Sequence, residues 1–145
     1  MSKNTLETKI REWQYSSEWY IYIYFITLSI YRGTELTLFS PQALYLQNNK
    51  IKQLPHSIGE LKNLQTLNIS GNNLKELPTT LPGLENLKSL DVSNNKLVKL
   101  PKELGNLRTL ETLTLDTDVV TYPGKDITKD GTEAIMRFFC SGKQK

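Results

Sequence analysis

Cysteine and histidine are almost absent from this chain, which has one of each among its 145 residues, Cys140 and His56. A metal centre needs several such ligands at short spacing, and a catalytic cysteine needs a base beside it. The sequence also contains no P-loop and no glycine-rich dinucleotide-binding motif. It therefore predicts neither an enzyme nor a metal or cofactor site.

Blocks of like charge are missing as well. The 18 basic and 15 acidic residues are spread along the chain and give a net charge of +3. Several lysines fall near one edge of the strands expected below, but no aromatic side chains lie between them as they do in single-stranded nucleic-acid sites. The pattern favours solvated lysines over nucleic acid binding; the lysines are Lys50, Lys52, Lys75, Lys96 and Lys99.

The N-terminal region has no apolar run of the length that a membrane-spanning helix needs. Residues 19–31 form an uncharged run of 13 residues rich in aromatic and β-branched side chains, bounded by Glu18 and Arg32. A spanning helix needs about 20 apolar residues. The first residues, with Lys3 soon followed by Glu7, lack the basic start and the small-residue cleavage site of a signal peptide.

A 23-residue repeat dominates the rest of the chain. Each of three copies has a Leu-x-Leu, Leu-x-Ile or Leu-x-Val core, an asparagine five residues after the first leucine, and a Leu-Pro pair. A fixed period between about 20 and 50 residues indicates a stack of repeats, each burying its apolar side against its neighbours. The leading leucines are Leu44, Leu67, Leu90 and Leu113, the asparagines Asn49, Asn72 and Asn95, and the prolines Pro55, Pro78 and Pro101.

Each copy predicts a strand, a turn and a short helical return. The Leu-x-Leu alternation favours a strand with one buried face. An asparagine amide carries donors and an acceptor, so we expect the three asparagines to form a structural ladder that satisfies the turn of their own repeat and of the next. The apolar residues that follow each proline are spaced by three, which favours 3₁₀ or short helical turns on the convex side.

These residues resemble the leucine-rich repeat family, in the 23-residue form typical of intracellular Ras-group and scribble-like scaffold proteins. The resemblance covers roughly residues 41–124. It implies an α/β repeat solenoid, an arc with a short-stranded parallel concave sheet, a 3₁₀ or helical convex side and a helical C-terminal cap. Extracellular members usually seal their ends with cysteine-rich caps, so a single cysteine favours a reducing, cytoplasmic location.

The repeat pattern decays in the fourth copy, and a cap is expected after it. Asp118 takes the asparagine position, and Tyr122-Pro123 replaces Leu-Pro one residue early. We expect residues 41–124 to hold three full repeats and one partial repeat, and residues 125–145 to form a cap helix and tail. Asp130 and Glu133 predict a capping-box start. Ile135, Phe138 and Phe139 share one helical face. The alternative is an amphipathic helix that binds a partner.

Residues 1–40 depart from the pattern, and three interpretations stay open. Leu6, Ile10 and Trp13 lie one helical turn apart, as in an N-terminal capping helix. The favoured interpretation is a cap or degenerate first repeat. The others are a membrane contact through residues 19–31 and a segment foreign to the family, as a variant transcript would append.

The expected concave face carries the candidate binding residues. Successive strand residues alternate between the two faces of a sheet, so the residues between the buried leucines form columns that we expect to point to solvent. Only Tyr45 is of a type enriched in hot spots. The alternative is a featureless solvated face. The first two columns are Tyr45, Asn68, Asp91 and Thr114, and Gln47, Ser70, Ser93 and Asp116; the third, of small residues, is Ala43, Thr66, Ser89 and Thr112.

The resemblance implies a non-enzymatic protein–protein interaction module, expected to be a monomer without cofactors. In the family this role includes scaffolding of signalling proteins such as small GTPases, kinases or phosphatases, and no residue here selects among them. One alternative is a membrane-associated protein tethered by residues 19–31, with its repeats on the cytosolic side. The other is a truncated or splice-variant member of the family.

Overall fold

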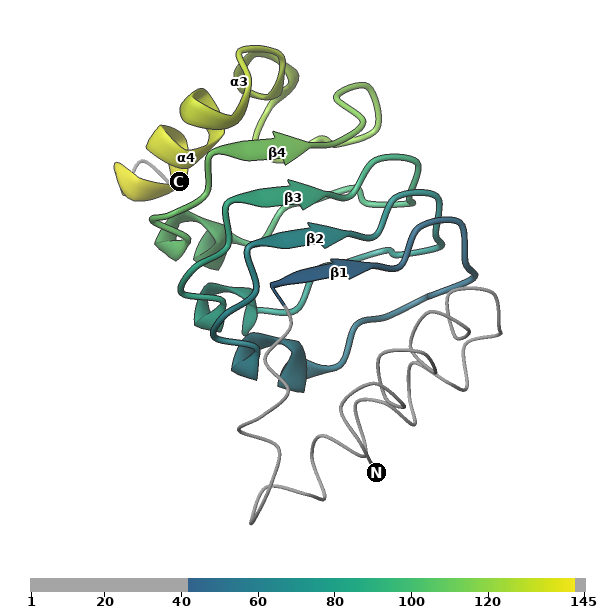
Figure 1. Ribbon diagram of the computed structural model, residues 1–145. Helices are drawn as coiled ribbons and strands as arrows, with labels where there is room; N and C mark the ends of the chain where they lie inside the picture. The colour runs from purple at the N-terminus through teal and green to yellow at the C-terminus, as the bar shows by residue number, and fades with distance from the viewer. Residues whose placement is uncertain (1–41, 143–145) are drawn as a thin grey trace, which may run out of the picture.

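The computed structural model describes residues 42–142. They form a stack of four strand-and-return units that ends in two short helices, α3 and α4, at the β4 end (Figure 1). The hypotheses about residues 1–40, namely a capping helix, a degenerate repeat, a membrane contact or a foreign segment, lie outside the described residues. The predicted division of the chain into three regions therefore stays a prediction.

Four strands of three residues each form one parallel sheet in the order β1-β2-β3-β4. The register follows the repeat period, because Leu44 pairs with Leu67, Leu67 with Leu90 and Leu90 with Leu113. Each of these leucines is buried, while its neighbours along the strand are half-buried or exposed. The strands are β1 (Ala43–Tyr45), β2 (Thr66–Asn68), β3 (Ser89–Asp91) and β4 (Thr112–Thr114).

Three 3₁₀ turns form the return side, as the three-residue spacing predicts: η2 (His56–Glu60), η3 (Leu81–Gly83) and η4 (Lys102–Asn106). Proline precedes η2 and η4, and Pro82 within η3 is incompatible with a regular α-helix at this point. The turns pack very closely: a Cβ atom on Gly59 would lie 2.3 Å from the carbonyl oxygen of Thr80. The close approach of η2 and η3 therefore requires glycine at position 59.

The core lies between the sheet and the 3₁₀ turns. It consists of columns of leucine, isoleucine and valine contributed by successive repeats, and Leu67, Leu84 and Leu104 are fully buried. One repeat alone would expose this face, so the stack is stable only when neighbouring repeats cover it.

The asparagines form a ladder, but its direction differs from the prediction. Asn72 Nδ2 donates to the carbonyl oxygen of Ile69 in its own repeat and to that of Leu46 in the preceding one, both at 2.8 Å. Asn72 Oδ1 accepts from the backbone N–H of Ile51 at 3.1 Å. The expectation that each asparagine serves the next repeat is wrong, because the side chain points back along the stack. Asn95 repeats the pattern on Ile69, Val92 and Leu74.

Each of the first three turns also contains a left-handed residue directly before the ladder asparagine. Asn48, Gly71 and Asn94 have φ values of 57°, 67° and 52°. Asparagine and glycine are the residues that adopt this conformation at low cost. Sequence reasoning missed this second requirement, although the signal recurs with the same period.

The fourth turn closes differently. Thr117 occupies the position of the left-handed residues, and no positive φ occurs there. Within residues 42–142 no hydrogen bond reaches the Asp118 carboxylate; the backbone N–H groups of Val119 and Val120 instead donate to the carbonyl oxygen of Asp116, at 3.2 Å. The ladder therefore ends after the third repeat.

Two helices follow, α3 (Lys125–Lys129) and α4 (Thr132–Cys140), and the predicted capping box is wrong. Asp130 ends α3, and the N-cap of α4 is Gly131 with φ 88°. Glu133 pairs with Arg137 one turn later instead of reaching back to an N-cap. The glycine separates two helices, since its left-handed conformation turns the chain between them.

The buried face of α4 covers the end of the stack, as expected for a cap. Ile135 and Phe139 are buried, and Phe138 is half-buried. The Tyr122 ring lies 5.8 Å from that of Phe138 and 5.9 Å from that of Phe139. A Cβ atom on Gly105 would lie 2.7 Å from that of Phe139, so α4 sits directly on η4.

Candidate protein-binding surface

The concave face, defined as the side of β1–β4 opposite the buried leucines, carries the columns expected from the repeat. The observed register aligns Tyr45, Asn68, Asp91 and Thr114 across the four strands. It aligns the small residues Ala43, Thr66, Ser89 and Thr112 in the same way.

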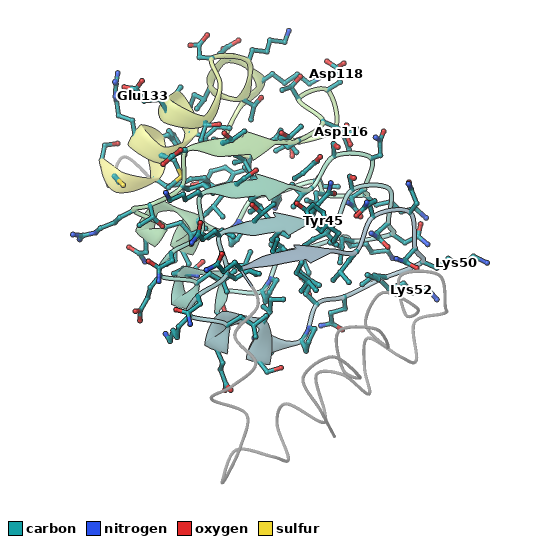
Figure 2. The ribbon with its side chains drawn as sticks, viewed as in Figure 1. Tyr45, Lys50, Lys52, Asp116, Asp118 and Glu133 are labelled. Atoms are coloured by element: carbon teal, nitrogen blue, oxygen red, sulfur yellow. The ribbon has the colours of Figure 1, made fainter. Side chains whose placement is uncertain are left out.

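Tyr45 is the most prominent side chain of this face. It is 46% exposed, and it is one of only three large apolar or aromatic residues so exposed within residues 42–142. It extends from β1, whereas Asp116 follows β4 at the opposite end of the sheet (Figure 2). The face thus has an aromatic end and an acidic end.

Two pairs of the expected site residues are bonded to each other. Asn68 Oδ1 accepts from Ser70 N at 3.0 Å and from Ser70 Oγ at 2.7 Å. Asp91 Oδ1 accepts from Ser93 N and Oγ at the same two distances. All four side chains are half-buried. Asp91 lies on the side of the sheet opposite the buried Leu90, and one of its oxygens also holds the chain just after β3.

The remaining candidates lie at the two ends of the face. Gln47 and Thr114 are exposed, and Asp116 is half-buried. The structure thus gathers all eight candidates on one surface, the concave face and the loops that follow its strands. Whether a partner uses them stays a prediction.

The loop edge beside this face carries lysines in its first three turns and two aspartates in its fourth. Lys50 and Lys52 lie at its β1 end, and Asp116 and Asp118 at its β4 end (Figure 2). All five lysines of the expected edge are exposed, and none forms an ion pair with another residue between 42 and 142.

Thr132 is a contact that sequence reasoning missed. Its Oγ1 accepts from the backbone N–H of Leu113 at 2.8 Å, at the free edge of β4. The hydroxyl therefore takes the place of a further strand at that position. The sequence gives no indication of this bond, because threonine is common at the start of a helix and its partner lies 19 positions away.

The residues considered for chemistry lie apart. His56 is exposed at the start of η2, and Cys140 Sγ donates to the carbonyl oxygen of Gly105 at 3.1 Å. Across residues 42–142, no group of three or more His, Cys, Asp or Glu side chains is placed to hold a metal ion. In the same part of the chain no helix has the length and apolar character needed to cross a bilayer.

Comparison with known proteins gives a consistent result. The family described as leucine-rich repeat region matches residues 36–130. A search of curated proteins returned no match. Among solved structures, a leucine-rich repeat protein of Leptospira interrogans is 38% identical with a TM-score of 0.59, over 66% of this chain and 24% of that protein.

Two plant structures also align over shorter stretches. The plant peptide hormone receptor RGFR1, solved in complex with RGF2, is 42% identical over 48% of this chain and 12% of the receptor, with a TM-score of 0.45. One chain of the BIR3–SERK2 complex from Arabidopsis thaliana is 33% identical, over 52% of this chain and 44% of that chain, with a TM-score of 0.46. The chain thus spans less than half the length of each of these three proteins.

Proposed function

Because the chain belongs to the leucine-rich repeat family of protein–protein interaction modules, we propose that it is a signalling adaptor or scaffold that binds a partner protein through its concave face. The family is typically non-enzymatic, and catalysis has no part in the proposal. The chain acts by presenting a rigid surface.

The observation that carries the proposal is the exposed, regular concave face. Its strands are fixed on the buried side by leucines and on the loop side by the asparagine ladder, so the outward side chains are held at constant spacing. Such preorganisation reduces the entropy lost on binding. Four strands about 4.8 Å apart span roughly 15–20 Å, which fits one segment of a partner.

We further propose a cytoplasmic location. The single cysteine, Cys140, has no second cysteine with which to form a disulfide within the chain. A reducing compartment keeps such a thiol free. Fractionation of cells that express the tagged chain would locate it.

The test is to obstruct the face without changing its charge. Thr66 and Ser89 are small, half-buried residues at the centre of the sheet. Replacing both with glutamine places two long neutral side chains across the surface. The tagged variant should lose partners that the parent chain recovers from cytosol, while its thermal unfolding stays close to that of the parent.

A matched control lies on the return side. Arg108 is exposed just after η4, outside the three columns of the concave face. The Arg108→Gln variant should recover partners like the parent. Equal recovery by both variants would place binding outside the concave face and refute the proposal.

A further inference from the structure

Two equivalent positions of the concave face make the same hydrogen bonds with side chains of different charge. Asn68 in β2 and Asp91 in β3 each accept from a serine N–H at 3.0 Å and from its hydroxyl at 2.7 Å. Since a neutral amide makes these bonds one repeat earlier, the bonds do not require the negative charge of Asp91. The local structure therefore leaves this charge unexplained.

The charge of the concave face also has the opposite sign to the net charge of the protein. Of the twelve column positions, only Asp91 and Asp116 are charged, both negatively, whereas the whole chain has a net charge of +3. Neither carboxylate forms an ion pair with a residue between 42 and 142. A surface of one sign attracts partners of the opposite sign and disfavours those of like sign.

An apolar contact point lies at a fixed distance from this charge. Tyr45 and Asp91 occupy the same column two strands apart, which places their Cα atoms about 10 Å from each other. Asn68 lies between them and is bonded to Ser70, and the neighbouring column carries the small side chains of Thr66 and Ser89. A partner backbone can therefore approach the sheet over the small residues, beside the column that holds Tyr45 and Asp91.

We propose that Asp91 makes the concave face selective for a cationic segment of a partner protein. An arginine or lysine of the segment pairs with Asp91, and an apolar or aromatic side chain packs on Tyr45. A segment in the polyproline II conformation has three residues per turn, so side chains three residues apart lie on the same face about 9 Å from each other, which matches the two sites. This inference rests on the proposed function, since it names the chemistry of the partner at the same surface.

The physical reason for selectivity is desolvation. A docked segment removes water from the half-buried carboxylate of Asp91. A cationic side chain replaces the lost water, whereas an apolar or acidic one leaves the charge uncompensated. Arginine fits best, because its planar group forms two parallel hydrogen bonds with a carboxylate.

The probe is a library of random peptides displayed on phage and selected on the full chain. We expect enrichment of peptides with arginine or lysine three residues from an apolar or aromatic residue. The selected peptide is then titrated against Asp91→Asn, which keeps the acceptor for Ser93 as Asn68 does for Ser70. Its affinity should fall about tenfold, as for loss of a partly desolvated charge pair.

Glu76→Gln is the matched control, because Glu76 is an exposed acid on the loop edge outside the columns. It removes one negative charge from the same protein, so the affinity of the peptide should stay within about twofold, as for a screened surface charge. An equal loss in both variants would show only an effect of net charge and would overturn the proposal.

Two further outcomes separate this proposal from the proposed function. In the first outcome, the peptide no longer binds the Thr66→Gln and Ser89→Gln double variant but binds Asp91→Asn with unchanged affinity. This result would overturn the cation selectivity and leave the concave site in place. A peptide bound equally by the double variant would refute the concave site itself. Should Asp91→Asn unfold, the parent alone decides: a dissociation constant that is the same at low and high salt overturns the proposal.

Discussion

The third and fourth turns of the stack occupy equivalent places in the repeat and have different structures. In the third turn Asn94 is left-handed, and the next residue, Asn95, bonds to its own repeat and to the one before it. In the fourth turn Thr117 and Asp118 occupy the same two positions; Thr117 does not have a positive φ, and Asp118 makes no ladder bond to another of the residues 42–142. The comparison shows that a ladder needs a residue that tolerates positive φ beside one that both donates and accepts.

The two turns are also stabilised from different sources. The third turn is held by its neighbours within the periodic stack. The fourth lies at the end of the stack, where α4 covers β4 through Thr132 and covers η4, the return of the third unit, through Phe139. Non-periodic contacts therefore replace the ladder where the repeat ends.

The largest effect is expected at this end of the stack. Phe139→Ala removes a buried aromatic side chain between α4 and η4, and the free energy of unfolding should fall by about 3–5 kcal/mol. Denaturant titration measures it, with Val119→Ala, an exposed position, as the control that changes by less than about 0.5 kcal/mol. A loss no larger than that of the control would mean that α4 does not seal the stack.

The next effect tests the ladder at equivalent positions. Asn72→Ala leaves the buried N–H of Ile51 without its acceptor, so the free energy of unfolding should fall by about 1–3 kcal/mol. Asp118→Ala removes a side chain that accepts no hydrogen bond within the described residues, so it should cost less than about 0.5 kcal/mol. Similar melting temperatures for the two variants would contradict this difference between interior and terminal turns.

The smallest effect tests the left-handed position. Gly71→Ala places a Cβ atom at φ 67° and 2.4 Å from Asn48 Oδ1, so we expect a loss of about 1–2 kcal/mol. Thr117→Ala, in the equivalent position of the fourth turn, has no positive φ to strain and should unfold like the parent. If both substitutions were neutral, the conformation of the turn would not depend on the residue there.

Much of the fold was predictable because it is built from copies of one sequence repeat. The strand register, the 3₁₀ returns and the buried leucines follow from a period of 23 residues, since each copy packs on another with the same spacing. The positions of the candidate site residues followed from the same period. Their hydrogen bonds did not, because the bonds of Asn68 and Asp91 to nearby serines depend on side-chain rotamers that alternation alone leaves open.

The C-terminal region was less predictable because it is not repeated. The apolar face of α4 was visible in the spacing of Ile135 and Phe139, yet the capping box at Asp130 was wrong. A glycine with positive φ starts the helix instead, which separates α3 from α4. Local sequence did not distinguish the two starts, since each offers a residue suited to an N-cap.

The sequence by itself determined the family, the parallel sheet and the face on which outward side chains gather. Apolar residues that repeat with a fixed period are buried when the repeats stack in register. The tertiary structure alone decided the direction of the asparagine ladder, the closure of β4 by Thr132 and the shared bonding of Asn68 and Asp91. Each of these depends on which polar groups meet when two units stack. Hydrogen bonds are directional, whereas apolar burial is not.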